Sequence, residues 1–147
     1  MEKKMKSHTR IKGVLLLGLL LVFCYQRGYS QQTYRYECVE QYIAGEESNM
    51  SVGWKIQLTI EADRCTCKDL GKDGNIPSQS YTCQFDRIED DGTSVYIRKY
   101  AVTTGIAGNT YMTEIIRISK DRSTVTKTLL SPVPTQYNPL EYIFKRM

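Results

Sequence analysis

Residues 54–62, WKIQLTIEA, alternate strictly between apolar and polar side chains. One set of alternate positions holds Trp54, Ile56, Leu58, Ile60 and Ala62, and the other holds Lys55, Gln57, Thr59 and Glu61. Successive side chains of a β-strand point to opposite faces, so this pattern predicts a strand with one buried face and one solvated face. It is the clearest strand signal in the chain, and the segments around it continue the pattern.

Further strands are predicted on both sides of this segment. Tyr34, Tyr36, Cys38 and Tyr42 are expected to share one face before it, and Tyr81, Cys83 and Phe85 another after it. Segments rich in β-branched and aromatic residues follow at 95–102, 111–118, 125–130 and 142–145. Turn signals separate them: Asp91-Gly92, a glycine loop at 105–109 and a polar turn at 120–123. The predicted fold class is all-β, an antiparallel meander of about seven strands closed as a small barrel or folded as a sandwich.

Residues 1–30 have the three parts of an export signal. A basic segment that includes Lys3, Lys4 and Lys6 precedes an apolar run at 14–23, and small residues follow at 28 and 30. The run is too short to span a bilayer, which takes about 20 residues. We expect cleavage before Gln31, leaving a single domain at 31–147 with no membrane span, secreted or periplasmic. The alternatives are a lipid anchor on Cys24, although the bulky Phe23 precedes it, and an uncleaved anchor.

Removing this segment changes the charge of the chain. The whole chain has 20 Lys+Arg and 16 Asp+Glu, and residues 1–30 hold six of the basic and one of the acidic residues. Residues 31–147 therefore carry 14 basic and 15 acidic residues, a net charge of −1. Their charges are interspersed, so no nucleic-acid partner is expected.

The only histidine, His8, lies in the predicted signal. A domain without histidine lacks the commonest general base and metal ligand, which excludes Ser-His-Asp and Cys-His catalysis and an imidazole zinc site. We expect no enzymatic activity, no cofactor and no metal.

Four cysteines remain in the predicted domain: Cys38, Cys65, Cys67 and Cys83. An even number in a small exported domain predicts two disulfides. In an extended Cys65-Thr66-Cys67 segment the two Cα atoms lie about 6.5–7 Å apart, with side chains parallel, at the upper limit for a bridge. We therefore expect Cys65 and Cys67 to pair with Cys38 and Cys83, in either combination. A four-cysteine metal site is the alternative, but its usual Cys-x₂-Cys spacing is missing.

The closing segments at 113–127 (TEIIRISKDRSTVTK) and 142–146 (YIFKR) resemble the last strands of small exported lipocalin-like proteins. The resemblance implies an antiparallel β-barrel. The Gly-x-Trp that opens many lipocalins is replaced here by the adjacent pair Gly53-Trp54, and no binding residue carries over.

Tyrosine is the compositional outlier, and Tyr96 and Tyr100 are the candidate binding residues. They alternate with Val95 and Ile97, so if those two are core, the tyrosines on the opposite face are exposed or line a second layer. Tyrosine suits contacts with glycans, small molecules or proteins. Trp54 is predicted to be a core anchor. The acidic cluster at 89–91 is read as a hairpin turn, and Asp69, Asp73 and Asn75 as a loop without the order of a calcium site.

Three functions are consistent with this sequence. The leading hypothesis is a non-catalytic module that binds a small molecule, glycan or protein. The second is a structural, interaction or inhibitor protein that acts through an exposed strand edge or a tyrosine patch. The third is a histidine-free enzyme that uses paired carboxylates.

Overall fold

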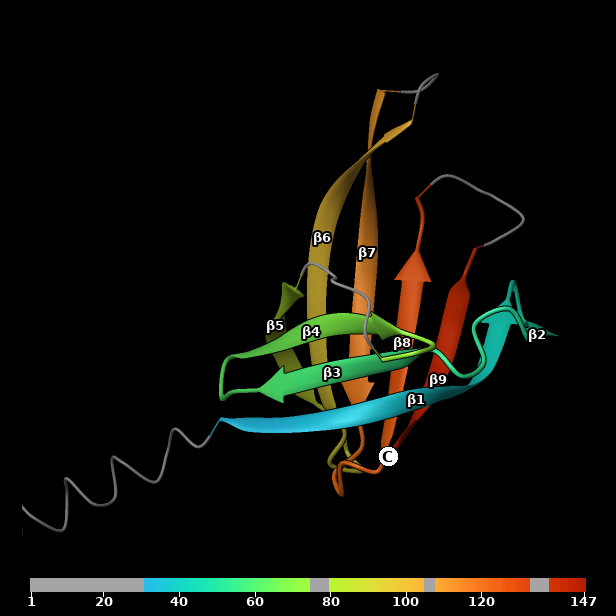
Figure 1. Ribbon diagram of the computed structural model, residues 1–147. Helices are drawn as coiled ribbons and strands as arrows, with labels where there is room; N and C mark the ends of the chain where they lie inside the picture. The colour runs from blue at the N-terminus through green and yellow to red at the C-terminus, as the bar shows by residue number, and fades with distance from the viewer. Residues whose placement is uncertain (1–30, 75–79, 105–107, 133–137) are drawn as a thin grey trace, which may run out of the picture. The chain divides into compact units, whose positions relative to one another are not determined.

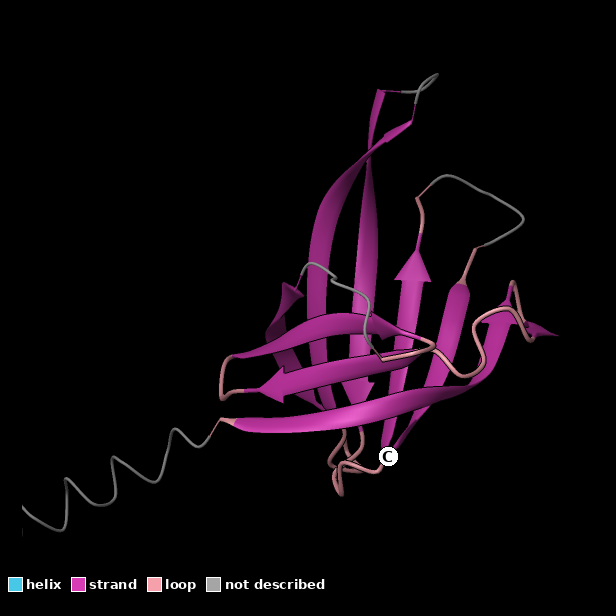
Figure 2. Cartoon of the chain, viewed as in Figure 1, coloured by secondary structure: helices cyan, strands magenta, loops and turns pink. Residues whose placement is uncertain are grey.

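The computed structural model describes residues 31–74, 80–104, 108–132 and 138–147. The predicted export signal and Asn75 lie outside the described residues. Residues Gln32–Met147 form one compact unit. Strands and turns account for the secondary structure of the described residues (Figure 2). No helix within them is long and apolar enough to cross a membrane.

The strands form one antiparallel sheet that closes on itself (Figure 1). They are β1 (Gln32–Ile43), β2 (Glu46–Ser48), β3 (Lys55–Ile60), β4 (Arg64–Gly71), β5 (Ser80–Ile88), β6 (Ser94–Thr104), β7 (Gly108–Ile118), β8 (Thr124–Leu130) and β9 (Leu140–Arg146). Neighbours in space follow the chain from β3 to β9, and β9 returns to pair with β1. The eight strands other than β2 therefore close a barrel, which confirms the predicted meander and decides between barrel and sandwich.

The period-two pattern of residues 54–62 is confirmed within β3. Ile56, Leu58 and Ile60 are buried, whereas Lys55, Gln57 and Thr59 are only partly buried. The predicted hairpins at 91–92 and 120–123 connect β5 to β6 and β7 to β8. Gly92 has a φ of 84°, a value that side chains disfavour, so the first of these turns depends on glycine. The strands β2 and β4 were not counted in the sequence prediction.

The face assignment in β1 was partly wrong. Tyr36 and Cys38 point inward, but a β-bulge between Cys38 and Glu40 shifts the alternation by one residue. Gln41, at 4% exposure, then takes the inward position, and the hydroxyl of Tyr42 donates a hydrogen bond to Glu40 instead. An extra residue in one strand reverses the faces of everything after it.

An apolar core fills one part of the barrel. It is built from inward residues of every barrel strand: Tyr36, Cys38, Ile56, Leu58, Ile60, Cys65, Cys67, Cys83, Tyr96, Ile116, Ile118, Val125 and Phe144. The hydroxyl of Tyr36 donates a hydrogen bond to the backbone oxygen of Arg122 in the β7–β8 turn. The core therefore packs against the end of the barrel that carries this turn.

The hairpin of β6 and β7 is longer than its neighbours. β6 pairs with β5 only as far as Ile97, and β7 pairs with β8 only from Thr113 onward. Residues 100–104 and 108–112 pair only with each other and extend past the barrel wall (Figure 1).

Candidate functional site

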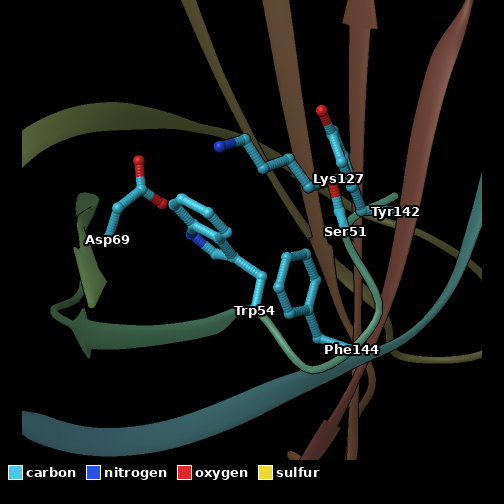
Figure 3. A pocket seen from close by; sticks show the side chains of 6 residues that line it. All are labelled: Ser51, Trp54, Asp69, Lys127, Tyr142 and Phe144. Atoms are coloured by element: carbon cyan, nitrogen blue, oxygen red, sulfur yellow. The ribbon is translucent and has the colours of Figure 1, made fainter. Parts of the chain in front are cut away.

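A cavity of about 240 Å³ opens inside the barrel, next to the apolar core. Its walls come from the segment before β3, from β4 and from the last two strands, with the side chains of Ser51, Trp54, Asp69, Lys127, Tyr142 and Phe144 (Figure 3). Three of these six side chains are aromatic. Trp54 and Tyr142 are partly buried and pack against the core, so Trp54, which was predicted to be a core anchor, lies between the core and the cavity.

A charged cluster lies behind this cavity and is centred on Glu114, whose side chain is fully buried. The carboxylate accepts hydrogen bonds from the Tyr81 hydroxyl at 2.6 Å and from Nε of Arg98 at 2.5 Å. Nζ of Lys127 lies 3.2 Å from Oε1, the oxygen that also accepts the Tyr81 hydrogen bond. A buried carboxylate is tolerated only when it is paired and hydrogen-bonded, and Glu114 meets both conditions.

Aromatic rings enclose the two cations of this cluster. The Arg98 guanidinium lies 3.5 Å from the ring centre of Tyr81 and 4.4 Å from that of Tyr100. Nζ of Lys127 lies 5.2 Å from the ring centre of Tyr81 and 5.9 Å from that of Tyr142. A cation within about 6 Å of an aromatic face is attracted by the ring quadrupole. The rings therefore help to hold both positive charges inside the barrel.

The electrostatics favour the charged form of Lys127 and the neutral form of Tyr81. Burial lowers the pKa of the Lys127 ammonium, but the negative charges of Glu114 and Asp69 outweigh it and leave the pKa above its usual value. Burial, assisted by Cys67 and Glu114, raises the pKa of the Tyr81 hydroxyl far above its ordinary value. At neutral pH Tyr81 is therefore a proton donor and Lys127 a cation.

The exposed position considered for Tyr96 is wrong. Tyr96 is 3% exposed and belongs to the core, and Tyr100, where the β6–β7 hairpin begins to extend past the barrel, is partly buried against Arg98. Val95, on the opposite face of β6, is itself fully buried. Both faces of β6 are covered at this point, so burial of Val95 does not imply exposure of Tyr96.

The predicted disulfides are absent from the structure, in which Cys38, Cys65, Cys67 and Cys83 are all free and buried. Cys65 is the direct cross-strand partner of Cys83. Cys38 and Cys67 lie on β1 and β4, which β3 separates. Two strand spacings amount to about 9.5 Å, beyond the roughly 7 Å that a bridge can span.

The acidic residues considered as candidates lie in different places. Glu89, Asp90 and Asp91 form the hairpin end, where Oδ1 of Asp91 accepts a hydrogen bond from the Thr93 amide at 2.8 Å. Asp69 lies in the cavity wall, and Asp73 is exposed. The described residues contain no cluster of three or more acidic, cysteine or histidine side chains that could hold a metal ion.

The sequence prediction missed Arg98, Glu114 and Lys127. A signal existed for Glu114 and Lys127, because each occupies the inward phase of its strand. Glu114 is in phase with Ile116 and Ile118, and Lys127 with Val125. Arg98 is in phase with Tyr96, but both faces of β6 are apolar or aromatic there, so the alternation does not mark Arg98. A charged residue at a position that the alternation assigns to the core indicates a buried ionic cluster.

The site is therefore an aromatic-walled cavity in a small antiparallel β-barrel, bordered by a buried ionic cluster. Comparisons of the chain with known protein families, with curated proteins and with solved structures found no match.

Proposed function

We propose that this protein is a non-catalytic binding module that takes up a small, largely apolar molecule inside its barrel. The observation that carries the proposal is the interior cavity lined by Trp54, Tyr142 and Phe144. Ligand sites in proteins are concave and mostly apolar, with a few polar groups that fix orientation. Here Ser51, Asp69 and Lys127 supply those polar groups.

The resemblance of residues 113–127 and 142–146 to lipocalin-like proteins supports the same proposal. An up-and-down antiparallel barrel of eight strands is an architecture that can hold one small ligand in its interior. The meander order and the β1–β9 closure are consistent with such a barrel. Export before Gln31 would place the binding module outside the cytoplasm, secreted or periplasmic.

An interaction role through an exposed strand edge has less support. Closure of the barrel pairs β1 with β9, so the described edges are the three-residue β2 at the end of β1 and the part of the β6–β7 hairpin that extends past the barrel. Short edge strands are a common way of limiting edge-to-edge association. A tyrosine patch has less support as well, because Tyr96 is a core residue.

The test uses Trp54, the only tryptophan of the chain, as a fluorescent reporter in the cavity wall. The protein is titrated with uncharged single-ring compounds, toluene, anisole and benzamide, while Trp54 emission is followed. We expect a saturable change in emission for at least one of them. The absence of saturable binding for all three would contradict the proposal.

A pair of variants locates the binding. Ser51→Phe places a ring in the cavity and should abolish the saturable change, whereas Ser80→Phe, at an exposed position of β5, should leave it unchanged. Equal effects of the two variants would show that binding takes place elsewhere.

A further inference from the structure

We propose that the cavity selects an uncharged, ring-containing ligand that carries a hydrogen-bond acceptor, over carboxylates and ammonium compounds of the same size. This inference rests on the proposed binding function and adds the chemical class of the ligand. It is carried by the balance of charges around the cavity and by the position of Lys127.

The charged groups that surround the cavity cancel. Lys127 and Asp69 lie in its wall, and Glu114 and Arg98 lie behind Lys127. Two cations and two carboxylates give a net charge of zero. A charged ligand would lose its hydration on entry without meeting an excess of opposite charge, and this loss is costly for any ion.

A charged ligand of either sign would also be repelled by a like charge next to the cavity. A carboxylate placed at Lys127 would approach Glu114, whose Oε1 is already 3.2 Å from Nζ of that lysine. An ammonium group placed at Asp69 would approach Lys127, which lies in the same cavity wall. Like charges in a medium of low dielectric constant repel strongly. An uncharged ligand avoids both conflicts.

Lys127 can recognise a hydrogen-bond acceptor of the ligand by donating to it. An ammonium group has three N–H donors, and one of them is directed at Glu114. The side chain extends from β8 into the cavity toward Trp54 and Asp69 (Figure 3). A carbonyl or ether oxygen of a ligand can therefore accept a hydrogen bond there and keep the partly desolvated cation satisfied.

The aromatic walls and the volume limit the rest of the ligand. Tyr142 and Phe144 have ring centres 6.2 Å apart, and Trp54 completes the apolar side of the cavity. Offset stacking on such rings favours a flat apolar body. A volume of about 240 Å³ is below the roughly 300–1,000 Å³ of typical ligand pockets, which suits one ring with a small polar substituent.

The experiment compares three probes of matched size and different charge: benzamide, benzoate and benzylammonium. Their dissociation constants at pH 7 are measured by Trp54 fluorescence and by calorimetry. We expect benzamide to bind at least about tenfold more tightly than either ion, a difference of about 1.4 kcal/mol. Equal or tighter binding of benzoate or benzylammonium would overturn the inference.

Replacing Asp69 by asparagine changes the charge balance around the cavity and keeps the shape of the side chain. Asp69→Asn leaves an excess of one positive charge and should move the preference from benzamide toward benzoate by about tenfold. Asp73→Asn removes the same charge at an exposed position that does not line the cavity, and should leave the ranking unchanged. No shift in Asp69→Asn, or the same shift in both variants, would overturn the charge argument.

Toluene separates this inference from the proposed function. Binding of toluene without binding of benzamide would overturn the requirement for an acceptor, while the barrel would still be a binding module. Failure of toluene, anisole and all three charge probes would overturn both proposals.

Discussion

Nζ of Lys127 lies 3.2 Å from Oε1 of Glu114 inside the barrel, on neighbouring strands whose other inward residues include Ile116, Ile118 and Val125. A buried ion pair is a weak source of stability compared with well-packed apolar residues. Removing one partner is strongly destabilising, because the other charge then stays buried without compensation. Glu114 pairs with both Arg98 and Lys127, so removing Glu114 should destabilise the fold more than removing either cation.

Glu114→Gln should lower the free energy of unfolding by about 3–5 kcal/mol, because Arg98 and Lys127 would remain inside the barrel without their carboxylate. Denaturant unfolding followed by Trp54 fluorescence measures the change. Glu89→Gln is the matched control, since Glu89 pairs with Arg87 and Arg117 at the surface, where ion pairs contribute about 0–1 kcal/mol. Similar losses in the two variants would contradict the role given to Glu114.

The architecture could be predicted from sequence because alternation at period two is local and repeated. β3 shows why: each of its inward positions is apolar and each of its outward positions is polar. The turn residues then set the order of the strands, as Asp91-Gly92 does between β5 and β6. Closure into a barrel depends on β1 meeting β9, a pairing of the two ends of the domain that no local pattern reveals.

The site could not be predicted in the same way. In β6 the residues on both faces are apolar or aromatic near Val95 and Tyr96, so alternation gives two faces without telling which one points inward. The bulge after Cys38 is a second case, because one extra residue reverses the faces of the strand. Charged residues in the inward phase, such as Glu114, were the usable signal.

The cysteines provide a second prediction, and here the structure and the sequence differ. The structure has four free thiols, and burial raises the pKa of Cys67 to about 11 and that of Cys83 to about 12. Since the thiolate is the reactive form, native protein should react very slowly with a thiol reagent. We expect four thiols per chain of residues 31–147 after unfolding in guanidinium without reductant.

Two missing thiols in that assay would show one bridge, and the cross-strand pair Cys65–Cys83 is the pairing that the sheet brings together. Four missing thiols would restore the two bridges that the sequence predicts. The Cys65→Ser and Cys38→Ser variants, compared by mass spectrometry of non-reduced peptides, separate these outcomes.

The predicted export signal gives a third prediction, on the N-terminus of the mature protein. Cleavage after Ser30 should give a protein that begins at Gln31, one residue before β1 starts. N-terminal sequencing and intact mass of the protein from its native host measure this directly. A start at Cys24 with an added acyl mass would instead establish a lipid anchor, and an intact residue 1 would establish an uncleaved segment. A Ser30→Pro variant should block the expected cut and leave the longer chain.

Asp121 provides a fourth prediction, on pH. The backbone N–H of Ser123 and the hydroxyls of Ser119 and Ser123 donate hydrogen bonds to its carboxylate in the β7–β8 turn, at 3.0, 2.7 and 2.8 Å. These bonds lower the pKa of Asp121 to about 2, from 3.8 in the unfolded chain. Because the unfolded chain takes up the proton first as pH falls, this stabilisation is present above about pH 4 and is lost as pH falls through about 2.

Thermal unfolding between pH 6 and pH 2 tests this directly. Asp121→Asn should have a lower midpoint than the unmodified protein at pH 6, and the two midpoints should converge as pH falls toward 2, where the carboxylate begins to be protonated in the folded chain as well. Asp90→Asn, at an exposed position in the β5–β6 turn, is the control and should run parallel to the unmodified protein over the whole range. A constant difference between Asp121→Asn and the unmodified protein down to pH 2 would show that the turn depends on the shape of the Asp121 side chain and not on its charge.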